Sequence, residues 1–83
     1  MIQVGGGDRV NHYKITAITG YGSAQIVRNV QAARDEGRLI DCTRGKKTRS
    51  VVFLESGQVV TSNSSQAALA ERWDREMGKY KQQ

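Results

Sequence analysis

A short basic segment holds the residue types that could do chemistry most directly. Four cations and no acid stand within the run Arg44-Gly45-Lys46-Lys47-Thr48-Arg49. Like charges placed this closely repel one another unless an anion compensates them. The segment therefore predicts a site that binds a polyanion through charge-assisted hydrogen bonds. The alternative is a solvated loop whose charges keep a strand-rich protein soluble.

The excess positive charge of the whole chain lies in this segment. The net charge is +5, yet residues 1–43 carry five cations and four acids, and residues 50–83 carry four of each. Charge gathered at one place favours a polyanion partner more strongly than the same charge spread over the surface. Lys14 and Arg9 could extend this basic surface, although a single exposed cation is more often an ordinary solvated charge.

The sequence offers little for catalysis or for metal binding. His12 could be combined with Asp8, Ser23 or Cys42 as base and nucleophile, but no hydrolase signature accompanies them. One histidine and one cysteine are too few for a closed zinc site. We therefore expect no enzyme activity, no cofactor, no metal and no small-molecule substrate.

The length of the chain favours self-association. A single domain of 83 residues buries only about 60% of the surface that its unfolded chain exposes. Domains of this size usually gain stability from disulfides, metals or partner subunits. Because Cys42 is the only cysteine, no disulfide can form within the chain. We therefore expect a homo-oligomer, with Leu69, Trp73 and Met77 as a core or subunit-contact stripe.

The sequence also predicts a cytoplasmic location. No apolar run approaches the ~20 residues of a membrane span. The first residues have neither the basic flank nor the apolar stretch of a secretion signal. A free Cys42, which we expect to be buried, agrees with a reducing compartment. We expect no membrane partner.

Several short strands should position the basic segment. Residues 14–19 alternate polar and apolar side chains, which is typical of a half-buried strand. Residues 50–54 are almost continuously apolar, as in a central strand covered on both faces. Residues 39–43 and 58–61 read as further strands, and residues 2–4 as a short one. The basic segment is then expected at a hairpin tip between two apolar strands.

Two helices complete the predicted elements. Ser23 can cap the first, whose apolar side chains recur at one-face helical spacing, and Gly37 can end it. The second should begin within residues 62–65, where Asn63 and Gln66 have the spacing of a capping box. The prediction is one α+β domain over residues 1–83, with a small mixed β-sheet and two helices, in which residues 74–83 form an extended or frayed C-terminal helix.

The run from Ala33 to Val51 resembles the signature of the RemA family of bacterial extracellular matrix regulators. It reads Ala-Arg-Asp-Glu-Gly-Arg-Leu-Ile-Asp-Cys-Thr-Arg-Gly-Lys-Lys-Thr-Arg-Ser-Val. The family's stretch reads Ala-Arg-acid-x-Gly-x-Leu-Ile-Asp-Ala-Thr-x-Gly-Arg-Arg-Thr-Arg-Ala-Val. Weaker similarity extends from about Val4 to Trp73. The resemblance implies a DNA-binding transcriptional regulator that assembles into a ring-shaped homo-oligomer and presents basic residues to duplex DNA.

The same resemblance implies particular site residues. Lys14, Lys46 and Lys47 take the places of basic residues implicated in DNA binding, and Arg49 matches the arginine that follows the family's threonine. Arg44 joins them as a candidate by charge alone. Lysine lacks the planar fork with which arginine pairs to guanine, so these positions favour phosphate contact over base readout. Two alternatives remain: an adaptor oligomer whose basic tip binds an acidic protein, and an RNA-binding protein.

Overall fold

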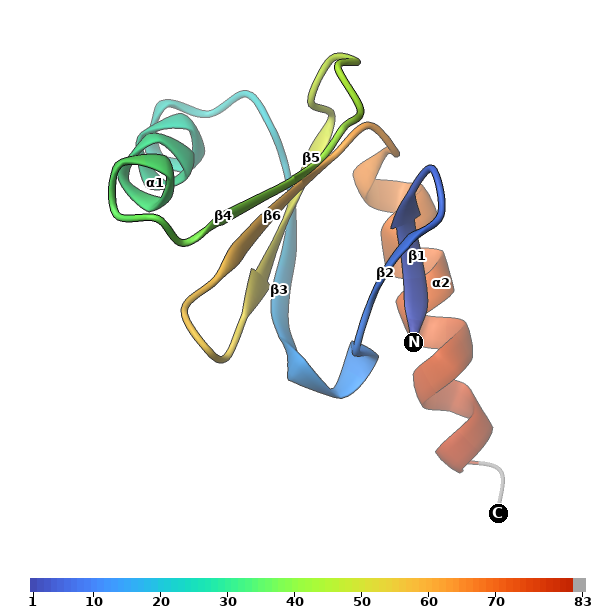
Figure 1. The fold of residues 1–83 in the computed structure, drawn as a ribbon. Helices are drawn as coiled ribbons and strands as arrows, with labels where there is room; N and C mark the ends of the chain where they lie inside the picture. Colours follow the sequence, from blue (N-terminus) through green and yellow to red (C-terminus); the bar gives the residue numbers. More distant parts are fainter. Residues whose placement is uncertain (82–83) are drawn as a thin grey trace.

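Two β-sheets and two α-helices build the fold of residues 1–81, which are the residues that the computed structural model describes (Figure 1). A short hairpin opens the chain, and its two strands form a sheet of their own. In chain order the elements are β1 (Ile2–Gly5), β2 (Asp8–Val10), the 3-10 helix η1 (His12–Lys14), β3 (Ile15–Gly20), α1 (Ala24–Asp35), β4 (Leu39–Cys42), β5 (Ser50–Leu54), β6 (Val59–Ser62) and α2 (Gln66–Lys81).

The four-stranded sheet is mixed, with its strands in the order β3-β5-β6-β4. Neighbouring strands from β3 to β6 are antiparallel, while β4 runs parallel to β6. The crossover through α1 therefore joins β3 to β4, the two outermost strands. The central place of β5 explains its apolar run, because Val51 and Val52 face opposite sides and both are fully buried.

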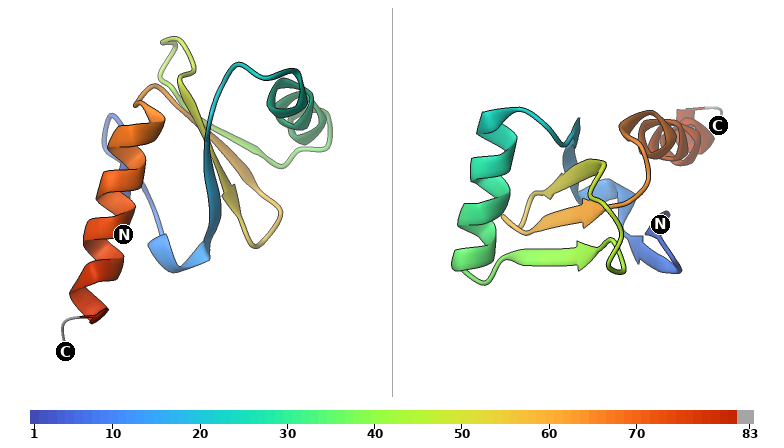
Figure 2. Two further views of the ribbon diagram at one scale, coloured as in Figure 1. Left: turned by 180° about the vertical axis from the view of Figure 1, so that it is seen from behind. Right: turned by 90° about the horizontal axis from the view of Figure 1, so that it is seen from above.

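A helix covers each face of this sheet, and the β1–β2 hairpin lies beside α2 (Figure 2). Successive residues of β5 and β6 divide between the two layers, as the two-residue period of a strand requires. Val51 and Val59 pack with the α1 residues Val30 and Ala33. On the other face, the buried cluster consists of Ile2, Val4, Ile15, Cys42, Val52, Val60 and Leu69. The predicted α+β fold is confirmed.

The first helix begins and ends where the sequence predicts. The Ser23 side chain accepts a hydrogen bond from the Ile26 amide, and Gly37 has the positive φ of 75° that ends many helices. The predicted capping box of α2 is wrong in its residues. The Ser65 hydroxyl accepts from the Ala68 amide at 3.1 Å. The side-chain Nε2 of Gln66 donates to the β3 carbonyl of Ile18 at 3.3 Å.

The basic segment is not the tip of a hairpin, as the sequence had indicated. Strands β4 and β5 do not pair, because β6 lies between them. The connection crosses the end of β6, where the Arg49 amide donates to the Ser62 carbonyl at 2.8 Å. The local pattern could not show this, because it identifies strands without identifying their partners.

Smaller differences concern the two ends of the chain. Lys14 ends η1 instead of opening a strand, and Arg9 lies in β2, a strand that the sequence did not predict. Within the segment predicted as a C-terminal helix, α2 continues as far as Lys81, and it runs well past the sheet (Figure 1). The last two residues of the predicted segment, 82 and 83, lie outside the described residues.

Candidate nucleic-acid interface

The basic loop, defined as residues 44–49, has a tightly turned backbone. Arg44 and Gly45 are both left-handed, with φ of 54° and 79°. A left-handed backbone conformation is common for glycine and uncommon for arginine. The Lys46 amide then donates to the Thr43 carbonyl at 3.0 Å, which closes the turn. The loop thus presents its side chains from a defined backbone.

Asp41 anchors the start of this loop. Its Oδ1 accepts from the Thr43 hydroxyl at 2.6 Å, from the Thr43 amide at 2.9 Å and from the Thr61 hydroxyl at 3.1 Å. The bonds from the Thr43 hydroxyl and amide are the main reason that the pKa of Asp41 is lowered. With the Arg49 amide bonded to β6, the loop is fixed at both ends.

Three cations of the loop point to solvent without internal compensation. Lys46, Lys47 and Arg49 are exposed, and none of them makes an ion pair with a side chain in the range 1–78. Arg44 differs, because its Nη2 lies 3.3 Å from Asp8 Oδ1. The electrostatic attraction of the loop for an anion therefore comes chiefly from three side chains.

Lys14 lies at the opposite end of the sheet. Its Nζ pairs with Glu55 Oε1 at 2.9 Å, and its carbonyl accepts from the Glu55 amide at 2.8 Å. Ile15 and Gly20, the two ends of β3, are opposite Leu54 and Ser50. At about 3.3 Å per residue, β3 separates Lys14 from the basic loop by roughly 20 Å. The structure therefore brings four of the five predicted residues together and leaves Lys14 apart.

A tyrosine that the sequence did not single out lies beside the basic loop. The Tyr21 amide donates to the Arg49 carbonyl at 3.2 Å, so the turn between β3 and α1 adjoins the loop. The Tyr21 side chain is 39% exposed. No role was predicted from the sequence for Tyr21, which stands between Gly20 and Gly22. An aromatic residue held between two glycines was the signal that could have identified it.

The residues considered for nucleophilic catalysis have structural partners instead. Ser23 caps α1, and Asp8 pairs with Arg44. Cys42 is free and buried, as expected, and burial raises the pKa of its thiol. His12 is buried with its Nδ1 2.9 Å from the N-terminal amine. The part of the chain that the structure describes contains no cluster of three potential metal ligands.

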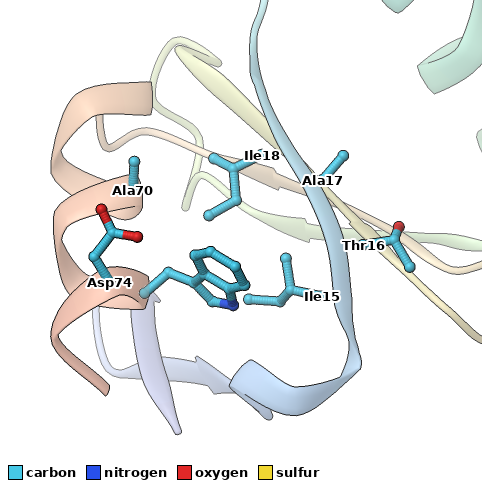
Figure 3. A pocket seen from close by; sticks show the side chains of 7 residues that line it. Ile15, Thr16, Ala17, Ile18, Ala70 and Asp74 are labelled. Carbon is cyan, nitrogen blue, oxygen red and sulfur yellow. The ribbon is translucent and has the colours of Figure 1, made fainter. Parts of the chain in front are cut away.

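A shallow apolar groove of about 230 Å³ lies between β3 and α2. Ile15 and Ile18 project toward α2, whereas Thr16 points to the other side of β3 (Figure 3). Trp73 also lines the groove, and its indole nitrogen donates to the His12 carbonyl at 3.0 Å. The carboxylate of Asp74 is the one charged group among the lining residues. This composition fits a packing surface better than a reaction site.

Comparison with known proteins agrees with the basic loop and its framework. Residues 1–73 match the family described as RemA-like, extracellular matrix regulatory protein A-like. The chain is 39% identical over 71 residues to candidate regulatory proteins of Bacillus cytotoxicus, Bacillus mycoides and Bacillus cereus. These alignments cover 86% of this chain and 82% of each relative. The chain belongs to the RemA-like family, as the run from Ala33 to Val51 had indicated. Among the described residues, no helix has the length and apolarity needed to cross a bilayer.

Proposed function

We propose that this protein is a non-enzymatic regulatory protein that acts in the cytoplasm and binds duplex DNA through its basic loop. The observation that carries the proposal is the set of three exposed cations, Lys46, Lys47 and Arg49, on a loop fixed at both ends. Membership in the RemA-like family and the regulatory names of the relatives support the same function.

The loop geometry favours contact with the phosphate backbone. A loop that is already ordered loses little conformational entropy on binding, so more of the electrostatic attraction appears as affinity. The lysines supply point charges that suit phosphates and carry little sequence information. Tyr21, next to Arg49, adds a hydroxyl that can donate to a phosphate. The expected footprint of one subunit is therefore small and unspecific.

Assembly of several subunits into a ring would convert these few contacts into useful affinity. Two surfaces support an oligomer. Strands β3 and β4 leave open edges on opposite sides of the sheet, and open edges readily pair with another strand. The groove lined by Trp73 runs along the edge of β3. A second subunit bound at β3 would cover both the open edge of β3 and the groove. If that subunit used its own β4 edge, the contacts would be head-to-tail, and such contacts can close into a ring.

A salt titration of DNA binding tests the proposal. Binding affinity falls by about 0.9 log unit per log unit of salt for each phosphate that the protein neutralises. The double variant Lys46→Ala, Lys47→Ala should remain folded and oligomeric but lose retention of DNA. Its matched control, Arg28→Ala with Arg75→Ala, removes the same charge from the exposed faces of α1 and α2 and should bind nearly as wild type does.

Three results would contradict the proposal. The first is unchanged binding by the double variant, and the second is equal loss by the control. The third is capture of an acidic protein after nuclease treatment, with no shift of duplex DNA, which would favour the adaptor function. A preference for single-stranded RNA in competition with duplex DNA would change the nucleic acid but leave the basic loop as the site.

A further inference from the structure

Arg44 differs from the other cations of the basic loop in what its side chain touches. It extends over the turn between β1 and β2, at residues 6 and 7. A Cβ placed on Gly6 would lie 2.3 Å from Arg44 Nε and 2.4 Å from Arg44 Cδ, which is closer than non-bonded heavy atoms approach a Cβ. The guanidinium then reaches Asp8, 3.3 Å away. The absence of a side chain at Gly6 is therefore what admits Arg44 to this place.

The hairpin that carries this turn is held against β4, which precedes the basic loop, and against β6, to which the loop is bonded. A Cβ on Gly5 would lie 2.5 Å from the Cys42 carbonyl oxygen and 3.0 Å from Asn63 Oδ1. The Ser62 hydroxyl donates to the carbonyl of Val4. The hairpin thus contacts the ends of two strands. The basic loop starts after β4, and its last residue, Arg49, is bonded to β6. The hairpin forms a fixed support beside the loop.

We infer that Arg44 is a positioning residue through which the β1–β2 turn sets the direction of the basic loop, and that it is not a phosphate-binding cation. This inference rests on the proposed DNA binding. Arg44 holds a left-handed φ of 54°, which is unfavourable for a residue with a side chain. Its packing over Gly6 and its pairing with Asp8 compensate that strain. Because Asp8 already neutralises Arg44, the anion-binding charge of the loop is that of Lys46, Lys47 and Arg49.

Amide hydrogen exchange tests the support without any DNA. In Gly6→Ala and in Arg44→Ala, exchange at the Lys46 amide, which closes the loop turn on Thr43, should accelerate at least about threefold. Gly7→Ala is the matched control, because Gly7 also has a positive φ, of 104°, but nothing lies within 4 Å of its Cβ position. Unchanged exchange in both test variants, or equal acceleration in the control, would overturn the inference.

DNA binding supplies a second test in which the two roles of a cation give different results. A phosphate-binding cation, such as Lys46, lowers the salt slope by about 0.9 when it is replaced by alanine. Arg44→Ala should instead lower affinity about threefold to tenfold at every salt concentration and leave the slope unchanged. A slope lowered by about 0.9 in Arg44→Ala would show that Arg44 binds phosphate and would overturn the inference.

The variant Asp8→Asn should change DNA affinity in opposite directions for the two possible roles of Arg44, phosphate binding and support of the loop. If Arg44 were a DNA cation restrained by Asp8, removing the acid would raise affinity. If the pair supports the loop, affinity should fall, by about twofold. Should the wild-type protein bind no DNA, the proposed function fails, while the exchange experiment still decides whether Arg44 supports the loop.

Discussion

The two ends of the four-stranded sheet both carry exposed cations, but they are built differently. At the end where β5 begins, the basic loop holds Lys46, Lys47 and Arg49 without acidic partners among the residues that the structure describes. At the other end, Lys14 is paired with Glu55 by side chain and by backbone. In the proposed binding mode, the cations that the fold leaves without an acidic partner attract the polyanion most strongly, and the paired Lys14 contributes less.

Charge reversal at the two ends should give the largest contrast. Lys47→Glu removes one phosphate contact and adds repulsion, so DNA affinity should fall at least tenfold near 0.1 M salt, since one contact alone is worth roughly eightfold there. Lys14→Glu changes the same charge about 20 Å away and should lower affinity by less than about threefold. Fluorescence anisotropy with a labelled duplex measures both. Equal losses would remove the distinction between the two ends.

Loss of the anchor at Asp41 should have an intermediate effect. Asp41→Ala removes the acceptor for Thr43 and Thr61, so the free energy of unfolding should fall by about 1 kcal/mol and DNA affinity by a few-fold. Asp35→Ala, at the end of α1, is the matched control, because the one donor to the Asp35 carboxylate among the described side chains is that of Gln31. Denaturant unfolding and DNA titration of the two variants make the comparison.

The contribution of Asp41 should also depend on pH in a defined direction. Its pKa is lowered in the folded protein, so its stabilisation is complete above the unfolded value of about 4. It is lost as the pH falls through the lower folded value. The stability difference between wild type and Asp41→Ala should therefore shrink below about pH 4. A difference that grows on acidification would mean that Asp41 is not held by these bonds as a carboxylate.

The smallest effect is expected from Tyr13 and Tyr21, the tyrosines that are exposed among the described side chains. Tyr21 lies beside the basic loop, while Tyr13 lies in η1 next to Lys14. Tyr21→Ala should weaken DNA binding about twofold to fivefold through the loss of one neutral contact, with the salt slope unchanged. Tyr13→Ala should leave binding within experimental error. A larger loss from Tyr13→Ala would place DNA at the Lys14 end.

The sequence predicted the elements better than their partners. The helices and β5 were predictable, because apolar spacing and the residues Ser23 and Gly37 act within a few positions of each other. The pairing of β4 with β6 could not be predicted, because it depends on the side of the sheet to which the connection through α1 leads. The short strand β2 has too few residues to show a pattern.

The candidate site follows the same rule. The clustering of cations at residues 44–49 is visible in the sequence. The ion pairs that neutralise some of the cations are not visible in the sequence, since Asp8 is 36 positions from Arg44 and Glu55 is 41 positions from Lys14. Tyr21 likewise joins the site only through its contact with Arg49. Residue types thus indicated the candidate residues, and tertiary contacts show which of them have an acidic partner.

Hydrogen–deuterium exchange of the intact protein, with and without a short DNA duplex, tests the central claim most directly. DNA bound at the basic loop should slow exchange in residues 43–49 and in the adjoining turn at residues 20–23. Exchange around Lys14 and Glu55 should change little, because that end of the sheet lies roughly 20 Å from the loop. Protection confined to residues 12–16 and 55–58, with none at the basic loop, would contradict the account.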